Sequence, residues 1–112
     1  MRRKSPESDL QNAIIHYLAL KRIPAWRNNR GSFYDAAQGR VRYGKVVTKP
    51  GSPDILGAIP PNGRLIAVET KGKYEKIRAK QETELYALEK AGAVVVLARD
   101  LNDVRCLFEE VR

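Results

Sequence analysis

Two short apolar runs separated by a tight break constrain the fold of this chain more than any other feature. The runs are residues 55–59 and 64–68, and the segment between them holds two prolines, an asparagine and a glycine. Apolar runs of this length, bounded by turn-forming residues, predict two strands joined by a turn. Asp54 stands directly before the first run, and Glu69 follows the second.

The polar residues at the ends of these two runs are expected to meet. The stretch from residue 64 to 71 is longer than its partner, so its end can reach past the start of the first strand. Alternate residues of a strand share a face, which makes Glu69 and Lys71 project together, roughly 6.6 Å apart along the chain. With Asp54, this gives two carboxylates and one ammonium at one sheet edge. The pattern predicts a divalent-metal site beside a cation, which is typical of nucleases.

Each of these residues also has a purely structural interpretation. Asp is common after proline in turns, as Asp54 is here. Glu69 and Lys71 could form a surface ion pair at a solvent-facing strand end. The functional interpretation is favoured because accidental convergence of several such polar residues is less probable than any one of them alone.

Composition limits the chain to one domain and points to a polyanionic partner. The chain has 112 residues and a formal net charge of +8, enough to bury one core but not two. Residues 22–49 hold seven Lys or Arg and one acid, and residues 71–80 hold five bases and one acid. Such clustering suits phosphate neutralisation, with binding that depends steeply on salt. A merely solvated basic surface is the alternative.

The sequence also favours a reducing, cytoplasmic setting with no membrane association. Cys106 is the single cysteine, which excludes an intrachain disulfide. The basic start of the chain is followed by no apolar segment of the kind a secretory signal needs. The longest apolar stretch, residues 93–98, is far too short to span a bilayer.

The remaining chain gives an alternating α/β order. Apolar spacing predicts helices over residues 7–22, 75–91 and 100–111, the second ended by Gly92. Strands are predicted at 23–27, 55–59, 64–71 and 93–98, the last covered on both faces. Residues 40–43 and 45–48 could form a small hairpin about Gly44. The expected order is α-β-β-β-α-β-α, a mixed sheet of about four main strands flanked by helices.

Two polar residues stand where the inward faces of the helices call for apolar ones. Gln81 lies four residues from both Ile77 and Leu85, and Glu7 precedes Leu10 by three. Burying such groups without partners costs about 1–3 kcal/mol, so both indicate a polar site beneath the helices. The alternatives are a helix-edge amide for Gln81 and, for Glu7, a first-turn carboxylate favoured by the helix dipole.

The sequence resembles the VRR-Nuc family, the virus-type replication–repair nucleases of the PD-(D/E)XK superfamily. The residues that carry the resemblance are Glu7, Trp26-Arg27-Asn28, Pro53-Asp54, Glu69-Thr70-Lys71 and Gln81. The resemblance itself spans residues 7–111. The resemblance implies a restriction-endonuclease-like core and a single nuclease domain over residues 1–112, in the stand-alone form.

The resemblance also implies a role for each matched residue. Asp54, Glu69 and the backbone carbonyl of Thr70 would bind Mg²⁺ or Mn²⁺, and Glu7 would bind it directly or through water. Gln11 is an alternative to Glu7 as the site residue of the first helix. Lys71 would position the attacking water and steady charge on the phosphate, while Gln81 would orient the site. No small-molecule cofactor is expected.

The implied activity is a metal-dependent endonuclease that cuts branched DNA, such as Holliday junctions or flaps, as a homodimer. Basic residues expected to contact the DNA backbone are Arg27, Arg30, Arg40, Arg42, Lys45 and Lys49. A sequence-specific restriction-type nuclease is one alternative. A catalytically inactive DNA-binding module is another.

Overall fold

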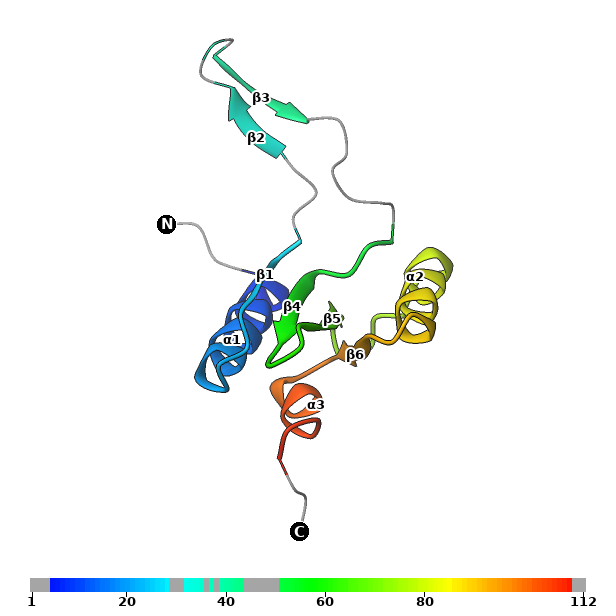
Figure 1. The fold of residues 1–112 in the computed structure, drawn as a ribbon. Coiled ribbons are helices and arrows are strands. Elements are labelled where there is room, and N and C mark those ends of the chain that lie inside the picture. The colour runs from blue at the N-terminus through cyan, green and yellow to red at the C-terminus, as the bar shows by residue number, and fades with distance from the viewer. Residues whose placement is uncertain (1–4, 29–31, 36, 38, 44–50, 110–112) are drawn as a thin grey trace.

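A computed structural model describes residues 5–28, 32–35, 37, 39–43 and 51–109 of the chain (Figure 1). The elements in chain order are α1 (Pro6–Leu20), β1 (Ala25–Arg27), β2 (Ser32–Asp35), β3 (Arg40–Tyr43), β4 (Ile55–Ile59), β5 (Arg64–Thr70), α2 (Ala79–Lys90), β6 (Val94–Ala98) and α3 (Leu101–Arg105). None of these described helices is long and apolar enough to cross a bilayer.

The predicted α/β fold with a mixed four-stranded sheet is confirmed. The strand order is β1-β4-β5-β6, and β2 pairs with β3 in a separate two-stranded sheet. The β1–β4 and β4–β5 pairs are antiparallel, whereas β6 runs parallel to β5. The parallel pair requires a crossover, and α2 supplies it.

The register of β4 and β5 places the acidic residues at one end of the hairpin. Ile55 pairs with Val68, so the next positions outward are Asp54 and Glu69. Strand β5 has seven residues and β4 has five. The longer strand therefore continues past the start of its partner, as the sequence predicts.

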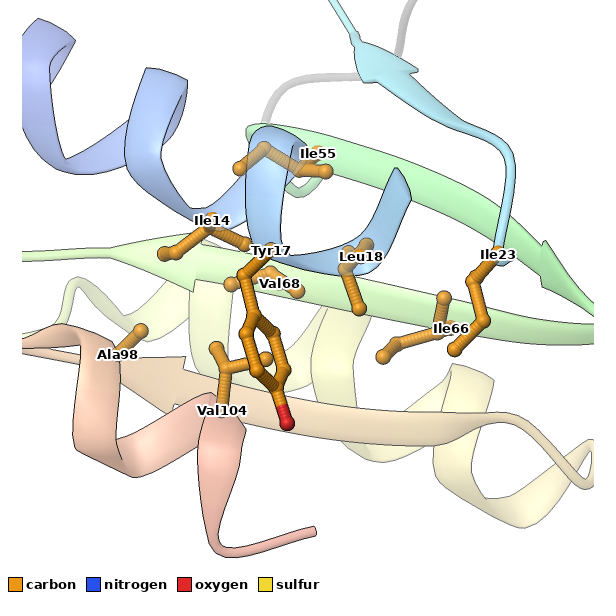
Figure 2. Close-up of a cluster of buried hydrophobic side chains, with 9 residues drawn as sticks. All are labelled: Ile14, Tyr17, Leu18, Ile23, Ile55, Ile66, Val68, Ala98 and Val104. Carbon is orange, nitrogen blue, oxygen red and sulfur yellow. The ribbon is translucent and has the colours of Figure 1, made fainter. Parts of the chain in front are cut away.

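The apolar core lies between the sheet and the helices α1 and α3. Figure 2 shows Ile14 and Leu18 of α1 over Ile66 and Val68 of β5, with Val104 of α3 beside them. All five side chains are fully buried, and each such burial stabilises the fold by about 1.5–3 kcal/mol. This packing fixes α1 against the sheet, next to the end of β5.

Helix α2 covers the opposite face of the sheet, so the end of β5 is enclosed from both sides. Because alternate strand residues face opposite ways, Thr70 shares the α1 side with Val68, and Glu69 faces α2. Gln81 and Leu85 are the buried residues of α2. The inward position predicted for Gln81 is confirmed.

Two predicted elements are wrong in extent. The second helix begins at Ala79 rather than near residue 75, because the preceding residues form a loop whose carbonyls bond to Arg99. The last helix ends at Arg105. Beyond it, the backbone amides of Leu107 and Phe108 donate to the carbonyl oxygens three residues earlier. Such turns are tighter than those of an α-helix and do not continue it.

Two further predictions concern β3 and β6. Residues 40–43 form a strand that pairs with β2, and the partner proposed for them, residues 45–48, lies outside the described residues. Strand β6 is at the sheet edge and only its last residue, Ala98, is fully covered. An unbroken apolar run does not distinguish an edge strand packed by two helices from a central one.

Candidate active site

A rigid turn before β4 holds Asp54 at the edge of the sheet. Gly51 has a φ of 82°, and a Cβ there would lie 2.6 Å from the carbonyl oxygen of Lys80, so only glycine fits. Asn28 Nδ2 donates to the carbonyl oxygen of Pro53 at 3.0 Å. The start of α2 and the end of β1 therefore both fix the turn.

The Asp54 carboxylate is bound to the end of β5. Its Oδ2 accepts from the Thr70 amide at 2.9 Å and from the Thr70 hydroxyl at 2.8 Å. Glu7 is exposed on α1, and its Oε1 lies 3.5 Å from the same hydroxyl. Glu7 therefore stands at the rim of the site rather than in its buried interior, where the spacing of α1 had placed it.

Glu69 is the buried acid of the site, with 1% of its surface exposed. Gln81 Nε2 donates to its Oε1 at 3.3 Å. Its Oε2 is buried and has no hydrogen-bond partner among the described residues. Burial is the main cause that raises the pKa of Glu69, to about 9. The Asp54 carboxylate adds to it, because it can accept a hydrogen bond from protonated Glu69 and repels the ionised form, whereas the charge of Lys71 lowers the pKa.

Lys71 is held beside the two acids by the loop that follows β5. Its side chain is 4% exposed, and its Nζ lies 3.4 Å from Glu75 Oε2. The other oxygen of Glu75 accepts from the Gly72 amide at 3.0 Å, and this backbone bond is the main cause of the lowered pKa of Glu75. Arg99 Nη1 donates to the carbonyls of Gly72 and Glu75, each at 2.6 Å.

A hollow of about 280 Å³ borders this site. It lies against Glu7 of α1, Lys71 at the end of β5, and the basic side chains of Lys73 and Arg99. A polyanion entering it would meet cations next to the buried acids.

The residues fit a divalent cation. An unpartnered buried oxygen on Glu69 and the adjacent Asp54 carboxylate give two hard oxygen ligands. No group of three or more Asp, Glu, His or Cys side chains that could hold a metal ion is found in the part of the chain that the structure describes. The arrangement suits Mg²⁺, which is usually bound through one or two carboxylates and keeps several waters.

The structure brings together most of the residues predicted for the site. Asp54, Glu69, Thr70, Lys71 and Gln81 lie at the open end of the β4–β5 hairpin.

Of the residues predicted to contact DNA, the structure describes the side chain of Arg27 alone. The Arg27 guanidinium is partly exposed and donates hydrogen bonds to Gln11, Ser8 and Asn12 of α1, so it supports the helix. Arg40 and Arg42 lie on β3. Arg30, Lys45 and Lys49 lie outside the described residues.

No family sequence profile and no curated protein sequence matches the chain. A search of solved structures finds a protein described as a "VRR_NUC domain", with a TM-score of 0.65 and 22% sequence identity. The match covers 97% of this chain and 100% of that one. The chain has the fold of a VRR_NUC domain.

Sequence reasoning missed three residues that shape the site. Glu75 could have been found as an acid four residues after Lys71. Gly51 could have been found as a glycine before a Ser-Pro-Asp turn. Arg99 gives no sequence signal, because its partners are backbone carbonyls of a loop 24 to 27 residues away.

Proposed function

We propose that the chain is a metal-dependent deoxyribonuclease that hydrolyses phosphodiester bonds in branched DNA. The observation that carries the proposal is the meeting of Asp54 and Glu69, with one buried carboxylate oxygen left unpartnered and Lys71 alongside. Such an arrangement is unfavourable for folding by itself. It is what a cation site between two acids requires.

Asp54 and Glu69 would hold Mg²⁺ or Mn²⁺ together with the Thr70 carbonyl, and Glu7 would reach it through water. The ion would supply Lewis-acid activation of the phosphoryl oxygen and a lowered pKa for bound water. Gln81 keeps the Glu69 carboxylate in one orientation through its amide.

Lys71 would stabilise the charge of the reacting phosphate. In hydrolysis a bond forms between phosphorus and the water oxygen, and the bond between phosphorus and a sugar oxygen breaks. Negative charge develops on the phosphoryl oxygens in the transition state. The Lys71 ammonium, fixed in a site from which water is partly excluded, would stabilise this charge strongly. The ion pair with Glu75 keeps this ammonium in place.

Charge and shape support DNA as the substrate. The net charge is +8, and the hollow beside Lys71 adds Lys73 and Arg99 to the approach. Selectivity for branched DNA and a homodimeric state are proposed from the resemblance to stand-alone VRR-Nuc nucleases. A two-fold dimer would set two such sites against a two-fold symmetric junction.

The test is cleavage of three end-labelled substrates: a four-way junction, a flap and a linear duplex. Wild type should cut the first two with Mn²⁺ and stop cutting when EDTA is added. Lys71→Ala and Glu69→Ala should lose cutting by at least about 100-fold while still shifting the junction in a binding gel. Lys90→Ala, at the far end of α2, serves as the matched control for loss of a lysine.

The same experiment separates the alternatives. Cutting of linear duplex at one sequence would identify a restriction-type nuclease. Binding of the junction without cutting by wild type, at any Mn²⁺ or Mg²⁺ concentration, would identify a DNA-binding module and refute the proposal.

A further inference from the structure

We propose that Gln11 is a positioning residue that takes its orientation from Arg27 and turns the Thr70 hydroxyl toward Asp54. The inference rests on the proposed cation site at Asp54 and Glu69, and it adds two residues of other elements to the support of that site. Neither residue touches the carboxylate directly.

Three consecutive hydrogen bonds connect Arg27 to Asp54. Arg27 Nη1 donates to Gln11 Oε1 at 2.7 Å, and Gln11 Nε2 donates to Thr70 Oγ1 at 2.9 Å. The Thr70 hydroxyl donates to Asp54 Oδ2 at 2.8 Å. This series of hydrogen bonds connects β1, α1, the end of β5 and the turn before β4.

The direction of these bonds is fixed by chemistry. A guanidinium only donates, so the side of the Gln11 amide that faces Arg27 must be its oxygen. The NH₂ group is then turned toward Thr70. A hydroxyl that accepts from Gln11 keeps its single hydrogen for a carboxylate, and Asp54 Oδ2 is nearer than Glu7 Oε1, which lies at 3.5 Å.

Arg27, the first residue in this series of hydrogen bonds, is itself held in place. Arg27 Nη2 donates to the Ser8 carbonyl at 3.0 Å and to Asn12 Oδ1 at 2.6 Å. At the other end Thr70 is fully buried. Both ends are fixed, so the Gln11 amide has one favourable orientation.

The consequence is a carboxylate that cannot turn freely. Asp54 Oδ2 is held by the Thr70 amide and hydroxyl, which leaves the remaining lone pairs of Asp54 with a constant direction. Groups that orient a metal ligand in this way typically change metal affinity by about 10–100-fold when they are removed. We expect a loss in that range when the Gln11 amide is lost.

The test compares Mn²⁺ binding of wild type, Gln11→Met and His16→Met by calorimetry at one pH. Gln11→Met removes both bonding atoms at similar length, and Mn²⁺ should bind at least about 10-fold more weakly. His16→Met places the same new side chain at an exposed position of α1 that the hydrogen bonds do not involve, so its affinity should stay within about 2-fold of wild type. Thermal unfolding of each variant shows whether it folds.

Gln11→Glu distinguishes positioning from direct binding. A carboxylate at this place accepts from both Arg27 and the Thr70 hydroxyl, which draws the hydroxyl hydrogen away from Asp54. Positioning therefore predicts weaker Mn²⁺ binding for Gln11→Glu. Tighter binding than wild type would mean that residue 11 is itself a ligand, and it would overturn the inference.

A second measurement does not depend on the metal. In ¹⁵N spectra recorded with EDTA, the Gln11 side-chain amide should give two separate, slowly exchanging protons with a contact to the Thr70 methyl group. Arg27→Met should abolish that slow exchange. Unchanged spectra in Arg27→Met, or unchanged Mn²⁺ affinity in folded Gln11→Met, would refute the inference. If wild type bound no Mn²⁺ while the spectra behaved as expected, the proposed function would fail and the hydrogen-bond chain would remain.

Discussion

Replacing Glu69 by glutamine should stabilise the protein in EDTA while removing the proposed nuclease activity. In the folded chain, burial and Asp54 raise the pKa of Glu69 from 4.5 to about 9. The protonated acid resembles the amide in shape. In the Glu69→Gln variant, the new amide would accept from Gln81 and donate to Asp54, so the substitution keeps the packing.

The sign of the pH dependence follows from where the proton binds. A raised pKa means that the folded state holds the proton more tightly than the unfolded state does. The stability contributed by Glu69 is therefore complete below pH 4.5 and is lost progressively as the pH rises to about 9. Between pH 5 and pH 8 the loss is about 3–4 kcal/mol, because each pH unit changes the free energy by about 1.4 kcal/mol.

The assay is urea denaturation of wild type and Glu69→Gln in EDTA at pH 5 and pH 8. The two proteins should differ little at pH 5, and the variant should be more stable by about 3 kcal/mol at pH 8. Saturating Mn²⁺ at pH 8 should then raise the stability of wild type more than that of the variant. A difference between the proteins that is the same at both pH values would refute the reasoning, because Glu69 would then be ionised in the fold.

Two further predictions concern the segments that frame the site. Gly51→Ala should lower the free energy of unfolding by about 2–4 kcal/mol, since its Cβ would meet the Lys80 carbonyl at 2.6 Å. Gly63→Ala is the matched control: its φ is 76° and no atom lies within 4 Å, so about 1 kcal/mol is expected in the same denaturation assay. Arg99→Met should cost about 1–2 kcal/mol and speed proteolysis between residues 72 and 78, and an unchanged digestion rate would contradict its role in holding the loop.

The centre of the fold could be predicted because local pattern and long-range pairing agree there. The residues 55–59 and 64–70 have apolar runs, a tight turn between them and unequal lengths, and these features together determine the register that sets Asp54 against Glu69. Gln81 could be placed because helical spacing with Leu85 gives its face without any knowledge of the partner.

The support of the site could not be predicted from the sequence. Glu7 occupies an inward position by spacing, yet it lies in the first turn of α1, where the helix has not reached the core. The sequence indicates a free basic residue at Arg27, because its hydrogen-bond partners on α1 are 15 to 19 residues earlier in the sequence. Arg99 bonds to backbone carbonyls, which every residue has, so no side-chain pattern records the contact.

The most direct test of the central claim is the anomalous scattering of Mn²⁺ in crystals of the protein. A peak between the carboxylates of Asp54 and Glu69, with Lys71 Nζ near but not bound to it, is the result expected. The same crystals of Glu69→Gln should lose most of the peak. A well-ordered site with both carboxylates free of Mn²⁺, or a peak elsewhere on the chain, would contradict the account.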